Sequence, residues 1–499
     1  MKQQPQRGIC ALLAACIVFS AAPRARATRF ADVPDTHWAA ADIELCAQQG
    51  IMNGVTPTAF GLGQPLSRAA CVVILNRVFQ WNAEDASALP YQDIAPGAWY
   101  VSALASAYRQ GVVTDQTRLF RPEEPVTRAE LAAMLIRALG YSVLSGLTEP
   151  VAFADVKANA GYISLAHDMG LINGSGGLFF PDNAATREQT AAILARLYRK
   201  LYAAPRKTGI VTSTDGLWAS AGLQSVAVAA GRLTGSQDAP ISYTVDPDAA
   251  ASLRASITAT GKQALLYLSG DSLRWNALNP IANAVAEGGY AGLLLELTSS
   301  YVEASQIQSL EGLLQNRFLH LIVPAPSETD DNYPYAALGK IADSVTVRVL
   351  GQSRLVNGFP SAPVEPLEEV YRTLRALFHS DTGEAPLLNP AKCALLVSTS
   401  GSVWTGATNT GLISARDVEA MLNEEGASGY YSERYACAYL RRPASDDTPE
   451  EVVWYLDSRA VASRVRLAKL FGVGGLVVTD ANGLTENLLQ AFSFNPRND

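Results

Sequence analysis

The stretch Thr127-Arg128-Ala129-Glu130 decides the fold of the N-terminal part of this 499-residue chain, because related stretches occur three times. The other two copies are Ser67-Arg68-Ala69-Ala70 and Thr186-Arg187-Glu188-Gln189. Each copy follows an aspartate segment, and these segments are Phe30-Ala31-Asp32-Val33, Tyr91-Gln92-Asp93-Ile94 and Phe153-Ala154-Asp155-Val156. The three aspartates are separated by 61 and then 62 residues. A fixed period of this length predicts a helical unit that buries its apolar face by packing on its copies.

The repeated stretches are predicted to begin the second helix of each repeat, after a first helix that covers about 39–49 in copy one. Two copies fit a capping box, in which each side chain satisfies an orphan backbone N–H, namely Thr127 with Glu130 and Thr186 with Gln189. Ser67 lacks this partner, since Ala70 stands there. Capping does not explain the arginine, because a cation in the first helical turn opposes the helix dipole by about 0.3–1 kcal/mol.

The repeated arginines, Arg68, Arg128 and Arg187, have two explanations. They form structural salt bridges with Asp32, Asp93 or Asp155, or they bind an anionic ligand together with the helix N-terminal amides. Trp38 and Trp99, each six residues after its aspartate, either supply a face for stacking on a sugar or pack in the core. The third copy has Gly161-Tyr162 at this place.

The combination of Phe-x-Asp-Val, Trp, a Gly-Ile-x-Asn-Gly turn and Thr-Arg-Ala-Glu resembles S-layer homology repeats over about 29–201. The resemblance implies repeats at 28–88, 89–150 and 151–202 that form an all-α-rich, pseudo-threefold bundle. It also implies that grooves of this bundle hold secondary cell-wall polymer, an acidic polysaccharide linked to peptidoglycan. The residues implied to bind the polymer are Arg68, Arg128, Arg187, Asp32, Asp93, Asp155, Trp38 and Trp99. The departures at Ala70 and Gly161 predict that the grooves differ in strength.

The N-terminus has the pattern of an export signal at 1–27. Lys2 and Arg7 precede an apolar run, which ends near the A-x-A site Ala25-Arg26-Ala27. Cys16 lies in a lipoprotein-like box, which leaves lipidation as the alternative. We therefore expect a secreted protein of the bacterial cell surface, with no transmembrane segment in the mature chain. The net charge of −8 argues against nucleic-acid binding through a basic face.

Four cysteines remain in the mature chain, and buried free thiols or disulfides are the alternatives for them; they are Cys46, Cys71, Cys393 and Cys437. The four histidines are scattered and there is no C-x-x-C pair, so we expect neither a metal site nor a cofactor.

After a predicted linker at 203–208, strand-length apolar runs alternate with helical stretches. The predicted strands begin at Ser225, Ile241, Ala264, Gly292, Leu319, Val345, Ala394 and Gly475. Continuous apolar strands separated by helices indicate a parallel sheet that is covered on both faces. Eight of them predict a (β/α)8 barrel, an α/β fold, over 209–496.

Chemistry in such barrels lies at the C-terminal ends of the strands, where the candidates are Glu296, Thr298, Arg348 and Asp480. Glu296 follows three leucines and is expected to point into the barrel. A desolvated carboxyl there suits a general acid, and a hydrogen-bonded interior carboxylate without activity is the alternative.

The segment 288–298 resembles strand four of the family 18 glycoside hydrolases, the chitinase-like group. The family's motif Asp-Gly-x-Asp-x-Asp-x-Glu ends on the catalytic acid, and this position is Thr298 here. The Tyr-Asp of the family's strand six is replaced by Leu350-Gly351, and Thr479 stands where the last strand carries Trp. The resemblance therefore implies a wall-attached protein with an inactive, glycan-binding barrel. The alternatives are an active hydrolase of N-acetylated wall glycan that uses Glu296, and a purely structural S-layer component.

Overall fold

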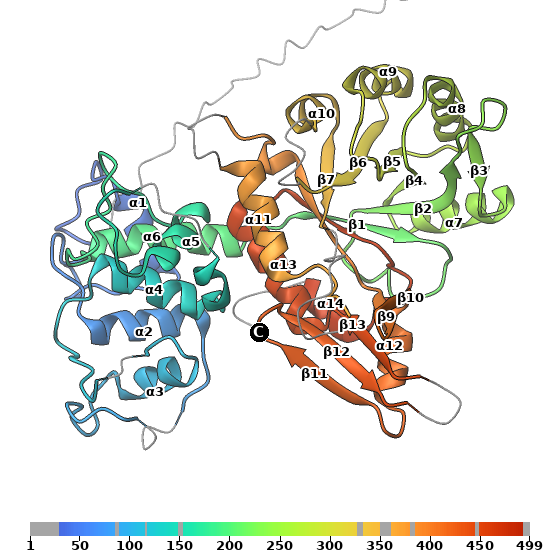
Figure 1. Ribbon diagram of the computed structural model, residues 1–499. Helices are drawn as coiled ribbons and strands as arrows, with labels where there is room; N and C mark the ends of the chain where they lie inside the picture. The colour runs from blue at the N-terminus through green and yellow to red at the C-terminus, as the bar shows by residue number, and fades with distance from the viewer. Residues whose placement is uncertain are drawn as a thin grey trace, which may run out of the picture.

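The computed structural model describes residues 29–84, 89–114, 117–147, 153–326, 333–349, 361–379, 385–444 and 449–492, which form a helical part and a larger α/β part (Figure 1). The predicted export signal, with Cys10 and Cys16, lies outside the described residues, as does Leu350-Gly351.

The named elements of the three repeats are helices. They are α1 (Ala40–Gln48), α2 (Arg68–Phe79), α3 (Val101–Arg109), α4 (Arg128–Ala138), η2 (Ser142–Gly146), α5 (Ala160–Asp168) and α6 (Arg187–Leu201). Each repeated arginine is the first residue of its helix, as predicted. Both predicted capping boxes are present. Ser67 caps α2 by accepting from the N–H of Ala70, without the reciprocal side-chain bond of a capping box. Local capping chemistry therefore sets where these helices begin.

A closed ring of backbone hydrogen bonds joins the three repeats ahead of these helices. The Leu66 N–H donates to Ala185 at 2.9 Å, the Ala185 N–H donates to Val126 at 2.9 Å, and the Val126 N–H donates to Leu66 at 2.8 Å. Each repeat thus donates to one neighbour and accepts from the other. The cyclic pattern requires all three copies, and it adds short extended bridges to a mainly helical region.

The second part contains a closed parallel barrel in the order β1-β14-β8-β7-β6-β5-β4-β2, and β1 pairs with β2 to complete it. The barrel strands are β1 (Arg206–Val211), β2 (Ser225–Leu233), β4 (Gln263–Gly270), β5 (Gly292–Leu297), β6 (Phe318–Pro324), β7 (Ser344–Arg348), β8 (Cys393–Val397) and β14 (Gly475–Val478). Inward-facing side chains fill the barrel with an apolar cluster that includes Leu265, Leu294 and Ile322. The predicted α/β barrel is confirmed.

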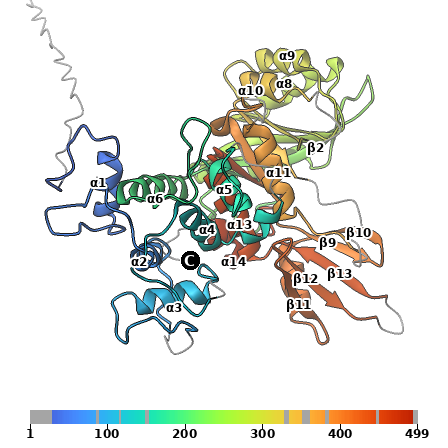
Figure 2. The same cartoon turned by 60° about the vertical axis from the view of Figure 1, so that its left-hand side comes forward.

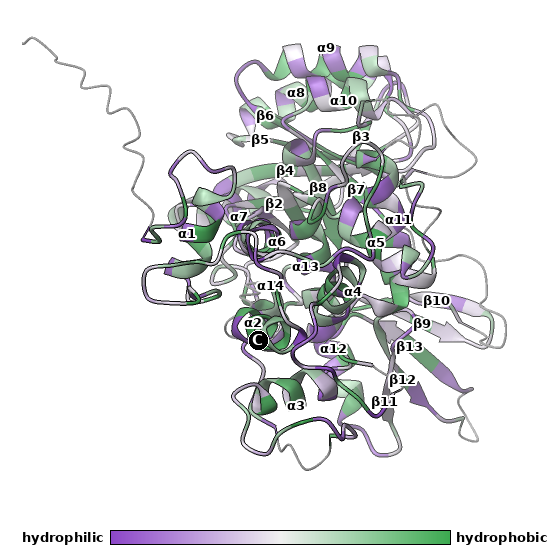
Figure 3. Ribbon diagram, turned by 90° about the vertical axis from the view of Figure 1, so that its left-hand side faces the viewer, coloured by the Kyte–Doolittle hydropathy of each residue, from purple (hydrophilic) through white to green (hydrophobic). Residues whose placement is uncertain are grey.

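Helices cover the barrel from outside (Figure 1). They are α7 (Pro247–Ala259), η3 (Trp275–Ala277), α8 (Leu278–Glu287), α9 (Ala304–Leu314), α10 (Tyr335–Ile341), α11 (Leu367–Phe378), η4 (Pro390–Lys392), α13 (Ser458–Phe471) and α14 (Glu486–Phe492). Outer helices such as α8 and α9 carry both hydrophilic and hydrophobic residues in Figure 3, as expected for helices with one face on the sheet.

Two boundaries differ from the sequence prediction. The run at Ile241 is β3 (Ile241–Tyr243), which pairs antiparallel with β2 at the edge of the sheet and is not a barrel strand. The missing barrel strand is β1, which begins at Arg206 inside the predicted linker and so starts the barrel before residue 209. Only Ala203, Ala204 and Pro205 lie between the end of the last repeat, at Tyr202, and β1.

A five-stranded antiparallel sheet, in the order β10-β9-β13-β12-β11, is inserted between β8 and α13 and was not predicted. It consists of β9 (Gly401–Thr405), β10 (Thr408–Ile413), β11 (Ser428–Ser432), β12 (Cys437–Arg442) and β13 (Glu451–Tyr455), together with α12 (Ala415–Leu422). One face of this sheet packs on α12 through Val418, Leu440 and Val453.

Candidate functional site

Each repeated arginine reaches into the next repeat and binds a phenylalanine there. The Nε atoms donate to backbone carbonyls at 2.8 Å, in the pairs Arg68 with Phe120, Arg128 with Phe179 and Arg187 with Phe60. The same guanidinium groups lie over the rings of these phenylalanines, at 5.2, 4.5 and 4.8 Å from the ring centroids. The arginine therefore links successive repeats around the ring, a role that reading one repeat at a time does not reveal.

The repeated aspartates hold the same phenylalanines from the other side. Asp32 accepts from the N–H groups of Phe60 and Gly61, both at 2.7 Å. Asp93 and Asp155 accept equivalent bonds in their own repeats, from Phe120 with Arg121 and from Phe179 with Phe180. These contacts hold the residue after each phenylalanine in a left-handed conformation, with φ of 87° at Gly61, 58° at Arg121 and 57° at Phe180.

The pKa of Asp32 and the pKa of Asp155 both lie below the ordinary value. For Asp32, burial raises the pKa, and the backbone N–H groups of Phe60, Gly61 and Leu62 outweigh it. For Asp155, the N–H of Phe179 is the main cause of the lowered pKa. Both carboxylates thus remain charged through the neutral range and clamp the phenylalanine turn.

The expected direct salt bridge between arginine and aspartate is not what holds Arg128 and Arg187. No carboxylate of the described residues lies within 4 Å of either guanidinium. Arg187 instead donates from Nη2 to the carbonyl of Asn53 at 2.6 Å, and Arg128 donates to that of Asn173 at 3.3 Å. Burial lowers the pKa of both arginines, and Asp155 and Asp32 respectively oppose this shift.

Arg68 has a different environment, because Glu130 of the next repeat forms an ion pair with it at 2.5 Å. Glu130 uses its other oxygen to accept from the Thr127 N–H at 2.9 Å, so the capping residue has two partners. Arg68 is only 4% exposed, whereas Arg128 and Arg187 are partly exposed. The third helical residue of each second helix therefore decides whether the preceding repeat's arginine is neutralised.

That position holds a different residue for each arginine. Gln189 accepts a long contact of 3.4 Å from Arg128, and the equivalent position of the first repeat, which Arg187 reaches, holds Ala70 with no polar side-chain atom. Two of the three arginines are thus partly exposed and have no carboxylate within 4 Å among the described residues, which suits a carboxylate or phosphate ligand.

The two tryptophans lie at the surface. Trp38 is 61% exposed and Trp99 is 65% exposed, so neither packs in the core. In the third repeat Tyr162 lies under Arg137 of the second repeat, with 4.7 Å from the guanidinium carbon to the ring centroid. The first two repeats therefore supply exposed indole rings six residues after Asp32 and Asp93, and the third repeat has Gly161-Tyr162 at this place in the sequence.

Glu296 points into the barrel, as expected, and is 3% exposed. Both of its oxygens have partners, since Arg348 forms an ion pair with Oε1 and the Tyr267 hydroxyl donates to Oε2. Burial, with Glu296 as the next cause, raises the pKa of Tyr267, which keeps this phenol protonated. The buried Glu296 carboxylate therefore has a polar partner on each oxygen, Arg348 on one and Tyr267 on the other.

The other strand-end candidates do not join this group. Thr298 contacts Asp271 at 3.3 Å on the exposed side, and Asp480 accepts from the Gly483 N–H at 3.0 Å. Thr479 accepts a 3.4 Å bond from the Thr399 N–H. Among the strand-end candidates, only Glu296 and Arg348 are brought together.

Glu365 is a buried acid that the sequence did not reveal. It is 4% exposed and accepts from the Ser398 N–H, directly after β8, at 3.0 Å. Burial raises its pKa to about 7, although Arg464, the Ser398 N–H and Arg348 each lower it. Its position between Val364 and Pro366 gives no local signal of this burial, which depends on distant elements.

The remaining expectations concern cysteines, metals and membranes. Cys46, Cys71, Cys393 and Cys437 are buried and free, as one of the two alternatives predicted. Within the described ranges, no group of three or more His, Cys, Asp or Glu side chains is arranged to hold a metal ion. The helices of these ranges include none with the length and apolar character needed to cross a membrane.

Comparison with known families identifies the repeats. S-layer homology domains match residues 29–70, 90–132 and 152–191, so the chain contains three of them. An amylopullulanase of Thermoanaerobacterium thermosulfurigenes is 29% identical over 180 residues, which are 34% of this chain and 10% of that protein. The S-layer protein sap of Bacillus anthracis is 24% identical over 170 residues, which are 34% of this chain and 21% of that protein. The chain thus matches only about a tenth to a fifth of the length of these relatives.

Solved structures resemble the barrel part. The chitinase of Chromobacterium violaceum is 18% identical with a TM-score of 0.48, and the match covers 58% of this chain and 98% of that chain. The Bacillus cereus spore cortex-lytic enzyme SleL is 13% identical with a TM-score of 0.45, over 58% of this chain and 75% of that chain.

Proposed function

We propose that this chain, with its three S-layer homology domains, is an exported cell-surface protein that binds secondary cell-wall polymer non-covalently. We further propose that it displays a glycosidase-like barrel that binds glycan without hydrolysing it. In this proposal the repeats act as a pseudo-threefold bundle whose grooves accept the acidic groups of the polymer. The matched domains and the cell-surface relatives support the location.

The groove that contains Arg187 is proposed as the main polymer site. The observation that carries this proposal is that Arg187 is partly exposed beside the Asp32-clamped Phe60 turn and has no carboxylate within 4 Å among the described residues. Trp38 follows Asp32 by six residues and is exposed, so a sugar ring can stack there while a carboxylate of the polymer meets the guanidinium. Trp99, in the repeat that Arg68 reaches, is also exposed, but Glu130 already forms an ion pair with Arg68.

The two tryptophans give a matched test. We expect Trp38→Ala to weaken sedimentation of the purified chain with native cell walls by about tenfold, equivalent to about 1.4 kcal/mol. Trp99→Ala, with nearly the same exposure, is expected to change it less than about twofold. Walls from which the polymer has been removed by acid extraction should bind neither variant nor the parent chain. Equal binding to stripped peptidoglycan would overturn the anchoring proposal.

The barrel proposal rests on the contacts of Glu296. A general acid delivers its proton to the substrate from an oxygen that faces it, and both Glu296 oxygens are held by Arg348 and Tyr267. Thr298, at the position that the resemblance assigns to the acid, cannot transfer a proton near neutral pH. These two residues argue against cleavage of N-acetylated glycan, and binding of such glycan is the part of the proposal that the next experiment tests.

Hydrolysis and binding are measured on the same full-length chain. We expect no release of reducing sugar from peptidoglycan or N-acetylglucosamine oligomers, and measurable binding of the same oligomers by calorimetry. Glycan cleavage that Glu296→Gln abolishes would establish the hydrolase and refute the non-catalytic barrel.

A further inference from the structure

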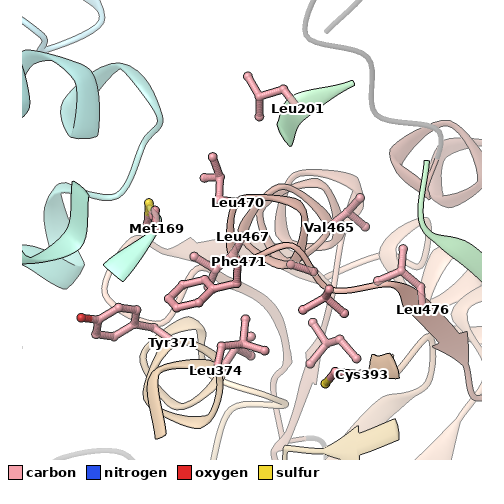
Figure 4. Packing of buried hydrophobic residues seen from close by; sticks show 14 of the residues in the cluster. Met169, Leu201, Tyr371, Leu374, Cys393, Val465, Leu467, Leu470, Phe471 and Leu476 are labelled. Atoms are coloured by element: carbon pink, nitrogen blue, oxygen red, sulfur yellow. The ribbon is translucent and has the colours of Figure 1, made fainter. Parts of the chain in front are cut away.

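The three repeats and the barrel meet along a seam formed by α5, α6 and 139–141 on one side, and by α11 and α13 on the other. Figures 1 and 2 both show α6 and α13 at this junction. Apolar side chains from both parts are buried there. Met169 and Leu201 of the repeats lie near Tyr371, Leu470 and Phe471 of the barrel part (Figure 4). The buried cores of the two parts form one continuous cluster.

Two lysines cross the seam in opposite directions. Lys200, near the end of α6, donates from Nζ to the Leu470 carbonyl of α13 at 2.7 Å. Lys469, near the end of α13, donates to the Leu201 carbonyl of α6 at 3.0 Å. Carbonyls in the last turn of a helix lack intrahelical partners, and cations are favourable at that end of the helix dipole. Each helix thus completes the C-terminus of the other.

A buried acid forms a second set of contacts. Asp168, the last residue of α5, is 7% exposed and accepts from the Tyr371 hydroxyl at 2.6 Å and from Arg375 Nε at 3.2 Å. His379 Nε2 lies 2.6 Å from the Asp168 backbone carbonyl. Burial raises the pKa of Asp168, but His167, Tyr371, His379 and Arg375 together lower it below the ordinary value. The carboxylate is therefore charged, and it is stabilised by His167 of its own helix and by Tyr371, His379 and Arg375 from across the seam.

A third set lies beside the end of α4. The fully buried Tyr141 donates its hydroxyl to the Ser463 carbonyl at 2.8 Å, and Arg466 Nη1 donates to the Leu139 carbonyl at 2.9 Å. The second and third repeats both contact the barrel part as a result. Because the contacts lie at three separate places, rotation of the repeats relative to the barrel about one of them would break the others.

We propose that the repeats and the barrel form one rigid body that unfolds cooperatively, so that the barrel is held in a single orientation relative to the grooves. The connection of three residues, Ala203 to Pro205, is too short to let the parts separate freely. Buried charged groups whose partners lie across the seam make separation of the parts unfavourable, because opening leaves those groups without compensation. The partner surface of α5 and α6 is therefore the α11–α13 face of the same chain.

The test uses the full-length chain and the double variant Asp168→Ala/Lys469→Met. Scanning calorimetry of the parent should give one transition with equal calorimetric and van't Hoff enthalpies. The double variant should unfold in two transitions. The control is Lys392→Met, which removes a lysine-to-carbonyl bond of 3.1 Å to Ala342 inside the barrel part and should keep one transition.

If the double variant does not fold, hydrogen exchange of the parent chain tests the same proposal. On the parent chain alone, the C-terminal turns of α6 and α13 should exchange only through the global unfolding reaction. Two transitions in the parent, or fast exchange of these turns while the rest of the chain stays protected, would overturn the proposal. A folded double variant that keeps a single transition at the parent's midpoint would also overturn it.

Discussion

Arg68 and Arg187 occupy the same place in two repeats and have opposite surroundings. Both start a helix, both donate from Nε to a phenylalanine carbonyl at 2.8 Å, and both lie over the ring of that residue. Glu130 neutralises Arg68, which is buried, whereas Ala70 leaves Arg187 partly exposed and without a carboxylate within 4 Å among the described residues. One residue of the neighbouring repeat thus separates a structural arginine from one suited to ligand binding.

The capping residue Glu130 has a second role between repeats. In helix initiation, Oε2 of Glu130 accepts from the Thr127 N–H. The ion pair through Oε1 connects that same residue to a position 62 residues earlier. The three copies thus differ at this position: Glu130 forms an ion pair with Arg68, Gln189 lies 3.4 Å from Arg128, and Ala70 has only a methyl group.

The largest expected effect is on stability. Arg68→Ala removes one partner of a mostly buried ion pair and should lower the free energy of unfolding by about 3 kcal/mol or more. Arg187→Ala removes hydrogen bonds to two carbonyls and the contact with Phe60, and should cost about 1–2 kcal/mol. Denaturant unfolding of both variants measures the difference. Equal losses would show that Glu130 does not distinguish the two sites.

Two buried acids of the barrel part also differ in their surroundings. Glu296 forms an ion pair with Arg348, whereas burial raises the pKa of Glu365 to about 7. The folded chain holds a proton on Glu365 that the unfolded chain releases near pH 4.5, so stability should fall as pH rises from about 4.5 through 7. Glu365→Gln removes this pH-dependent loss, so its free energy of unfolding should exceed that of the parent by up to about 3 kcal/mol at pH 8 and by little at pH 4. Unfolding curves at both pH values test it. A gain that does not depend on pH would contradict the assignment.

Sequence reasoning located the features that depend on local chemistry. The helix starts at Arg68, Arg128 and Arg187 follow from Ser or Thr caps that act within four residues. The inward direction of Glu296 follows from the alternation of side chains along β5. The partners of these residues were not predictable, because Glu130 and Arg348 come from other repeats or strands and no local pattern records the pairing.

The errors in the fold have similar causes. The sequence predicts a linker where β1 begins, because Arg206, Lys207 and Thr208 are polar and follow a proline, although the next residues are buried. The Ile241 run is apolar enough for a barrel strand, and only its antiparallel pairing with β2 makes it an edge strand. The inserted sheet was missed because its outer strands are mostly exposed and polar, as in β10.

The open site can be closed by copying the second repeat. Ala70→Glu places a carboxylate where it can neutralise Arg187 and complete the capping box with Ser67. We expect wall sedimentation to fall by about tenfold, with stability unchanged or raised by about 0.5 kcal/mol. Ala70→Gln, the residue type of the third repeat, is the control and should retain most binding. A similar loss in both variants would indicate a steric effect and would weaken the charge argument.

The reverse change opens the closed site and has the smallest expected effect. Glu130→Gln keeps an acceptor for the Thr127 N–H and removes the charge that pairs with Arg68. Because Trp99 of the same repeat as Asp93 is already exposed, the freed guanidinium should add a second, weaker polymer site and raise wall binding about twofold to threefold. The gain should disappear in Glu130→Gln/Trp99→Ala and should shrink in high salt, since an exposed charge contact is screened. Unchanged binding in Glu130→Gln would mean that burial of Arg68, and not its pairing with Glu130, keeps this groove closed.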